Sequence, residues 1–318
     1  MKKSIGSYFS LELQHNLNNE CYPEAIFLNT GRNALEYILR VLKIEKLFLP
    51  FFSCDALYKP LKEQNISYEF YNLDHNLVPI FDYSKLKKSE YFLYINYFGV
   101  KSKTVNELSL KIQNLIIDNS QAFFSKPDKK NPTFYSIRKF FGVTDGALLL
   151  NVPEEIEIGQ DKSAGRMDYL LKRLENPVEE AYSTYQIVEE ELGKLPLLLM
   201  SNITRSIFSS VNFETHRKKR NKNFKILHKE FGGMNQMDIE QVNGPLCYPL
   251  LLNNGSEIRK ELIKERIFLP TYWPNVFEMV SEKSFEYQIT NNLIAIPVDQ
   301  RYDFKDMVRV ISNIKKLL

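Results

Sequence analysis

The segment around Lys139 combines an amine with aromatic neighbours. Lys139 lies between Arg138 and the pair Phe140 and Phe141. An amine that is shielded from water loses part of its preference for the charged form, which lowers its pKa and makes it a usable nucleophile. We therefore expect the two phenylalanines to shield Lys139 from water, and the segment indicates amine chemistry.

A carboxylate and an amide follow a second apolar run. Asp118 comes directly after residues 115–117, and Gln121 follows three positions later. The apolar run predicts a buried strand, so Asp118 would lie at the carboxyl end of a strand, where ligands collect in an open parallel sheet. An acid at such a position is also commonly a helix cap or a solvated residue, and the pair alone does not decide between these roles.

A third segment could bind an anion. Gly31, Arg32 and Asn33 precede apolar residues at helical spacing, at positions 34, 35, 38, 39 and 42. The first backbone N–H groups of a helix attract anions together with the helix dipole, and Gly31 would let a phosphate approach closely. A glycine before a helix is also an ordinary turn, so this segment gains weight only beside the other two.

Short apolar strands that alternate with helices must position these three segments. We predict strands at residues 47–49, 66–71, 91–96 and 115–117 and helices at residues 31–42, 56–64 and 105–113. Continuous apolar strands in such alternation are typical of a mostly parallel sheet with helices on both faces, so the predicted fold class is α/β.

The pattern changes after residue 150. A long polar helical tract predicts an outer helical layer, and a strongly basic helix then begins at Phe213 and leads to Gly232. Apolar runs at 248–252 and 293–297 alternate with helices at 259–265 and 304–318. We predict a large domain over residues 1–210 and a smaller C-terminal α/β domain over residues 211–318.

Composition excludes several classes of protein. The chain has 318 residues, is 44% hydrophobic and carries a formal net charge of +3, which is ordinary for a globular protein and leaves no global field for nucleic acid. No apolar run approaches the roughly 20 residues of a membrane span, and the N-terminus lacks the apolar core of a secretory signal. We expect a cytoplasmic protein without a membrane partner.

Cysteines and histidines give no sign of a metal site. Three cysteines without close spacing argue against a disulfide framework or zinc and favour a reducing compartment. The histidines have no acid or cysteine at ligand spacing, so no metal is expected. These residues are Cys21, Cys54, Cys247, His15, His75, His216 and His228.

Five segments in order resemble one enzyme family. They are residues 31–35, residues 49–53, residues 117–122, Lys139 followed by Asp145 and Gly146, and residues 269–273. In this order they resemble the DegT/DnrJ/EryC1/StrS family of sugar aminotransferases, which use pyridoxal 5'-phosphate (PLP) and have the PLP-dependent transferase fold type I. The similarity is spread over most of the chain.

The resemblance implies roles for the catalytic residues. Lys139 would bind PLP covalently and shuttle a proton between two carbons, and Asp118 would pair with the pyridine nitrogen. Gln121 would lie near the 3-oxygen of the cofactor.

The resemblance also implies a phosphate site. The phosphate would bind at the helix start, at Gly31 and Arg32, with the backbone of Asn33 as a further donor. Ser136 or Arg138 would reach the same phosphate from the lysine segment.

The chain departs from the family at three places. The serine usual five residues before the lysine is replaced by Phe134. The aromatic residue usual against the cofactor ring is replaced by Cys54, unless Phe52 or Phe51 takes that role from a displaced turn. The segment that usually reaches the partner subunit's cofactor is not recognisable after residue 160, where Asn202 is a weak substitute. The chain is also shorter than typical members.

The function that the resemblance implies is transfer of an amino group from glutamate to a keto sugar nucleotide. The enzyme would be a cytoplasmic homodimer in surface polysaccharide or lipopolysaccharide biosynthesis. One alternative is a PLP-dependent sugar dehydratase, although that branch replaces the lysine by histidine. Another is a catalytically silent member that acts as a binding or regulatory protein.

The basic helix has three interpretations. Its cations at residues 216–229 could contact a nucleic acid, or they could form the solvated side of an amphipathic helix whose apolar side holds Phe213, Phe224 and Leu227. In the third, Arg217 or Arg220 contributes to binding an anionic nucleotide or glutamate. We favour the solvated side and expect no nucleic acid polymer as a partner.

Overall fold

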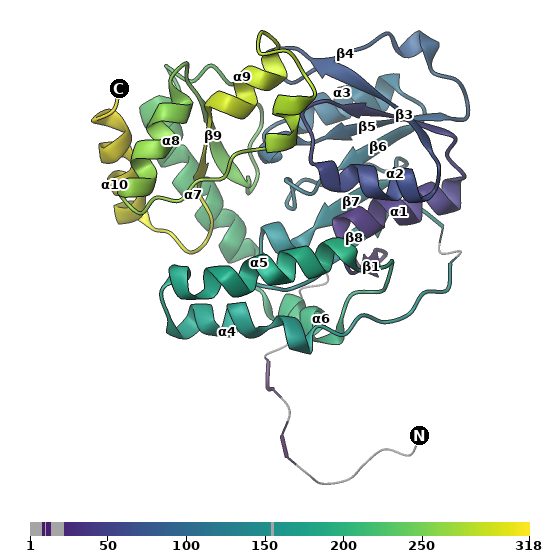
Figure 1. Cartoon of the computed structure of the whole chain (residues 1–318), viewed down its shortest axis with the longest axis horizontal. Coiled ribbons are helices and arrows are strands. Elements are labelled where there is room, and N and C mark those ends of the chain that lie inside the picture. Colours follow the sequence, from purple (N-terminus) through teal and green to yellow (C-terminus); the bar gives the residue numbers. More distant parts are fainter. Residues whose placement is uncertain (1–7, 10, 14–21, 154–155) are drawn as a thin grey trace.

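Eight strands form one sheet in the computed structural model, which describes residues 8–9, 11–13, 22–153 and 156–318. His15 and Cys21 lie outside these residues. Figure 1 shows the sheet, whose order is β1-β8-β7-β6-β5-β2-β3-β4. Its strands are β1 (Ile26–Leu28), β2 (Lys46–Pro50), β3 (Ser67–Leu73), β4 (Pro79–Ile80), β5 (Glu90–Ile95), β6 (Leu115–Asp118), β7 (Thr133–Ser136) and β8 (Ala147–Leu150).

Six of these strands run in the same direction. β2 pairs in parallel with β3 and β5, β5 with β6, and β6 with β7. β8 is antiparallel to both of its neighbours, β7 and β1, so β1 shares the common direction, and β4 is antiparallel to β3. The predicted mostly parallel sheet is confirmed, and the carboxyl ends of its parallel strands lie along one edge.

The predicted helices are present in the predicted order, and the structure adds helices over residues 202–210 and 285–292 that were not predicted. No described helix combines the length and apolar character needed to cross a membrane. The helices are α1 (Gly31–Leu42), α2 (Tyr58–Glu63), α3 (Ser102–Lys111), α4 (Asp168–Glu175), α5 (Val178–Lys194), α6 (Asn202–Ser210), α7 (Phe213–Phe231), α8 (Gly255–Lys264), α9 (Phe285–Asn292) and α10 (Phe304–Lys315).

Helix α1 begins where its sequence predicts. Thr30 is the N-cap, and its side-chain oxygen accepts a hydrogen bond from the Asn33 N–H at 3.1 Å. Such a cap satisfies one of the N–H groups that a helix start leaves without a partner. The apolar positions predicted from helical spacing face the core, where α1 packs against β7 and β8.

A second, two-stranded sheet lies at the other end of the molecule. β9 (Cys247–Leu251) and β10 (Leu293–Pro297) pair in an antiparallel manner, and α7, α8 and α10 pack around them. We call these five elements the C-terminal unit (Figure 1). Its core is continuous with that of the large sheet. One contact across this core is the edge-on packing of Trp273 on Phe52, with ring centroids 4.7 Å apart.

The β1 edge of the sheet is covered by a later part of the chain. The Asn29 N–H donates to the Leu198 carbonyl at 2.9 Å, and the Met200 N–H donates to the Phe27 carbonyl at 2.9 Å. The segment 198–200 therefore runs beside β1 and pairs with it.

Candidate active site

The carboxyl ends of three parallel strands bring together residues that are far apart in the sequence. Asp118 ends β6, Lys139 lies in a 3-10 turn directly after β7, and Cys54 follows β2. The charge of Lys139 acts on both Asp118 and Cys54. The structure thus assembles an amine, a carboxylate and a thiol at the edge where ligands bind in this class of sheet.

Asp118 is a buried carboxylate. Only 4% of its surface is exposed, and one of its oxygens accepts the Ser120 N–H at 2.7 Å. Burial raises the pKa of Asp118 above its usual value, while the charge of Lys139 and the hydrogen bonds from Ser120 partly oppose that rise. A carboxylate in such surroundings is stabilised by a cationic N–H donor.

Ser120 links the carboxylate to the amine, and the sequence analysis did not identify it. The Lys139 Nζ donates to the Ser120 Oγ at 3.2 Å. Ser120 thereby contacts Lys139 through its side chain and Asp118 through its backbone. The only signal in the sequence is a serine two residues after an acid, which is typical of a local turn.

Gln121 presents an unused donor. Its Oε1 accepts the Phe98 N–H at 2.8 Å, and Phe98 holds the left-handed backbone conformation with a φ of 55°. This contact leaves the buried Nε2 of Gln121 without a hydrogen-bond partner. Because an unpaired buried donor is costly, Gln121 is suited to a ligand that brings an acceptor.

The expectation that aromatic neighbours shield Lys139 is wrong. Phe140 and Phe141 are 2% and 6% exposed and pack in a second core cluster with Phe123, whereas Lys139 itself is exposed. The physical reason is the tight turn, because successive residues of a 3-10 turn point in different directions. Lys139 therefore faces the open edge of the sheet while the two rings face the core.

The start of α1 lies beside β7. A Cβ added to Gly31 would be 3.7 Å from the Cβ of Ser136, which places these two candidate phosphate residues next to each other. The Asn33 N–H is already bonded to Thr30, and the Asn33 side chain donates to Asn29 at 2.8 Å. The first-turn N–H groups of Gly31 and Arg32 remain as the donors of this helix start.

The side chains of Arg32 and Arg138 reach helix α5 instead. Arg32 donates to the carbonyls of Leu192 and Leu195, at 3.1 and 2.7 Å, and also to that of Gly193. A cation at these carbonyls satisfies the helix end. Burial lowers the pKa of Arg32, and nearby Glu36 and Glu63 oppose this effect.

Arg138 forms an ion pair with Glu189 of α5, and its buried Nε has no hydrogen-bond partner. Its guanidinium is thus bound by α5, the helix whose end also binds Arg32.

The positions that depart from the family differ in their surroundings. Cys54 is half-buried, and burial raises the pKa of its thiol while the charge of Lys139 opposes the rise. Phe134 is 1% exposed and belongs to the core, so it brings no polar group to the site. Asn202 is exposed at the start of α6, where Ser201 provides the cap.

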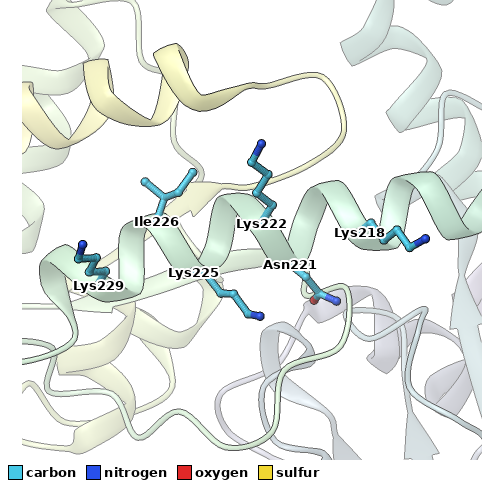
Figure 2. Close-up of a pocket in the computed structure, with 6 residues that line it drawn as sticks. All are labelled: Lys218, Asn221, Lys222, Lys225, Ile226 and Lys229. Carbon is cyan, nitrogen blue, oxygen red and sulfur yellow. The ribbon is translucent and has the colours of Figure 1, made fainter.

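The basic helix is α7, and its outer side is a row of lysines. Lys218, Lys222, Lys225 and Lys229 are exposed and surround a shallow hollow with Asn221 and Ile226 (Figure 2). Phe224 and Leu227 are buried on its other side, as predicted for an amphipathic helix. In the described part of the chain, no three residues among His, Cys, Asp and Glu are grouped to hold a metal ion.

Solved structures share this fold. The sugar aminotransferase CalS13 from Micromonospora echinospora is 12% identical, with a TM-score of 0.62, over 92% of this chain and 87% of that chain. A DegT DnrJ EryC1 StrS aminotransferase from Brucella abortus is 13% identical, with a TM-score of 0.62, over 92% and 85%. NtdA from Bacillus subtilis, solved with bound cofactor PMP, is 10% identical, with a TM-score of 0.64, over 92% and 72%.

The likeness confirms the predicted fold class. The chain has the PLP-dependent transferase fold type I, with the strand order described above and with β8 and β4 antiparallel to the other strands. No family model matches the sequence. No curated protein matches it either.

Proposed function

We propose that this chain is a PLP-dependent aminotransferase that transfers an amino group from glutamate to a keto sugar carried on a nucleotide. The observation that carries the proposal is the grouping of Lys139, Asp118 and the unpaired Gln121 amide at the carboxyl edge of a sheet with this fold. The names of the structural neighbours, which are aminotransferases and in part sugar aminotransferases, support the same class of reaction.

The described residues fit the polar groups of PLP. The ring nitrogen would find the buried carboxylate of Asp118, and the 3-oxygen would find the unpaired Nε2 of Gln121. The phosphate would meet the N–H groups of Gly31 and Arg32 with Ser136 beside them. Cys54 would face the ring from the loop after β2.

PLP, when bound, supplies an electron sink for the electron pair that remains when a proton leaves the carbon bearing the amino group. Asp118 would hold a proton at the ring nitrogen, because a buried carboxylate favours a charged N–H partner. The Lys139 Nζ would take the proton from one carbon and return it to another. Ser120 would keep that amine near the ring by accepting its hydrogen bond at 3.2 Å.

Several finer assignments belong to the same proposal. The acceptor would be a sugar nucleotide of surface polysaccharide or lipopolysaccharide synthesis, and the enzyme would act as a homodimer in the cytoplasm. The division into domains 1–210 and 211–318 follows the separation of the two sheets, since α7 begins at Phe213.

Two observations favour a catalytically silent binding protein as a second candidate. Phe134 brings no hydroxyl to the phosphate side, and Arg138 is paired with Glu189. Both features remove family-type phosphate donors from the site, so a weakened cofactor site is the physical basis of this alternative.

Binding of PLP decides between the two candidates. The wild-type chain reconstituted with PLP should show a visible absorption band from covalently bound cofactor, and Lys139→Ala should abolish it because no amine remains to form the bond. Lys225→Ala is the matched control, since Lys225 is an exposed lysine on the outer side of α7. Glutamate and a panel of keto sugar nucleotides then test amino transfer.

A wild-type chain without the band would remove the aminotransferase proposal and favour the binding protein. A band that survives Lys139→Ala would remove Lys139 from its role and leave the fold without its assigned nucleophile.

A further inference from the structure

Arg220 of α7 is a buried cation that touches the lysine turn. Its side chain is among the largest fully buried ones, and the residue is 1% exposed. It donates to the Pro245 carbonyl at 3.0 Å, to the Phe140 carbonyl at 3.3 Å and to Gln300 Oε1 at 3.2 Å. Within the described ranges, no carboxylate oxygen lies within 4.0 Å of its guanidinium.

Burying a guanidinium among neutral acceptors costs free energy, because the charge loses its hydration. An apolar side chain of similar volume avoids the loss of hydration, so a buried cation without a paired carboxylate indicates a further role. Burial lowers the pKa of Arg220 to about 10, and Asp299 partly opposes this effect. The guanidinium is therefore still charged at neutral pH.

The C-terminal unit and its neighbouring loop hold Phe140 in two ways. The Phe140 carbonyl accepts hydrogen bonds from Arg220 and from Gln300 Nε2, the latter at 2.8 Å. The guanidinium carbon of Arg220 also lies 4.5 Å from the centroid of the Phe140 ring. Phe140 directly follows Lys139, so both contacts bear on the backbone that carries the amine.

The turn has other restraints as well. The Phe140 and Phe141 rings pack in the second core cluster, Arg138 pairs with Glu189, and the Ile137 N–H donates to the Gly146 carbonyl at 3.2 Å. The Ile137 carbonyl accepts the N–H groups of Phe140 and Phe141, each at 3.0 Å. At its free end, the Lys139 side chain contacts Ser120. The backbone of Lys139 is thus held from the C-terminal unit, and its amine is held from the loop after β6.

We propose that Arg220 is a positioning residue for Lys139 and that Gln300 assists it. Both would hold the Phe140–Phe141 peptide, one residue beyond Lys139, so that the amine stays beside Ser120 and Asp118. The inference rests on the proposed function only for the role of Lys139. Through the hydrogen bond from Arg220 to the Phe140 carbonyl, the C-terminal unit contacts the turn that carries Lys139.

Hydrogen exchange of the full chain without added PLP tests this holding of the turn. Arg220→Met should speed exchange in peptides covering residues 137–143 about tenfold relative to a β6 peptide, because hydrogen bonds from a charged donor are lost. Gln300→Leu should speed it about threefold, since the turn loses one neutral hydrogen bond and Arg220 loses the acceptor at Gln300 Oε1.

Arg259→Met is the matched control. Arg259 is 8% exposed and donates to the Leu293 carbonyl, yet it belongs to α8 and, among the described residues, forms no hydrogen bond with the lysine turn. The proposal fails if Arg259→Met speeds exchange of residues 137–143 as much as Arg220→Met does. It also fails if Gln300→Leu leaves the turn unchanged where Arg220→Met does not fold.

A second measurement uses the PLP-loaded protein. The apparent pKa of its visible band should move in Arg220→Met, move back toward the wild-type value in Arg220→Lys, and stay unchanged in Arg259→Met. A band that titrates identically in all variants would overturn the positioning role. Absence of the band in the wild type would remove the proposed function, whereas the exchange experiment would still decide whether Arg220 holds the turn.

Discussion

Basic residues lie in different surroundings in two cation-rich segments of this molecule. In the turn after β7, Arg138 is paired with Glu189 and Lys139 with Ser120. On the outer side of α7, exposed lysines face water around a shallow hollow (Figure 2). The difference lies in the partners that the fold supplies, since only the turn lies at the carboxyl edge of a parallel sheet.

The same contrast occurs within α7 itself. Arg220 and Asn223 are each 1% exposed, and Asn223 donates to the Val298 carbonyl at 3.1 Å. Lys222 directly precedes Asn223 and Lys225 follows it by two positions, and both lysines are exposed. A charge count therefore says little about function, whereas the helical face on which a cation lies says much.

Of the substitutions that distinguish the sheet edge from the outer side of α7, removing the charge of Asp118 should have the largest effect on activity. Asp118→Asn should reduce amino transfer by about 10²–10⁴-fold, because the proton at the ring nitrogen loses its anionic partner. The same variant should be more stable to urea than the wild type at pH 7. Steady-state kinetics and urea unfolding check the two results.

The sign of the stability change follows from the raised pKa of Asp118. A carboxyl whose pKa is higher in the folded state stabilises the fold below its unfolded pKa, about 4, and loses that contribution as the pH rises through the folded pKa. The higher stability of Asp118→Asn relative to the wild type should thus vanish as the pH falls below about 4.

Asp82→Asn gives the opposite sign as a control. Hydrogen bonds from Ser84 lower the pKa of Asp82, so this variant should lose stability at neutral pH. Equal behaviour of the two variants would contradict the environment assigned to Asp118.

Replacing Arg32 should have an intermediate effect. Arg32→Met removes charged hydrogen bonds to the carbonyl end of α5 and should lower the free energy of unfolding by about 2 kcal/mol. Lys264→Met, which breaks an exposed pair with Glu261, should cost less than about 1 kcal/mol. Urea unfolding compares the two, and an equal loss would show that Arg32 does not cap α5.

More of the fold than of the candidate site could be predicted from the sequence. Helix α1 and strand β6 follow from local periodicity and from the residues at their ends, which a sequence displays directly. Asp118 and Lys139 come together because parallel strands end at one edge. The pairing of Lys139 with Ser120 and of Gln121 with Phe98 depends on contacts between distant segments, which no local pattern encodes.

The error at Lys139 has a similar origin. Its neighbours Phe140 and Phe141 are apolar, as the sequence displays, but the direction of each side chain depends on the 3-10 turn. The two-residue strand β4 is likewise too short to give a periodic signal.

The smallest effect is expected on the outer side of α7. Lys225→Glu relieves repulsion from Lys222 and Lys229 at helical spacing and should raise the free energy of unfolding by no more than about 0.5 kcal/mol. It should leave PLP binding unchanged. A loss of cofactor binding would show that the outer lysines, like the turn, belong to the functional part of the molecule.

The segment 198–200 has a consequence for how copies of this chain could associate. By pairing with Phe27 and Asn29, it takes the backbone groups that the β1 edge would otherwise offer to another strand. Exposed edges are templates for aggregation and for continuous sheets between molecules, and covering them prevents both. A second copy that approaches this end of the sheet must therefore bind through helices, loops and side chains rather than by strand addition.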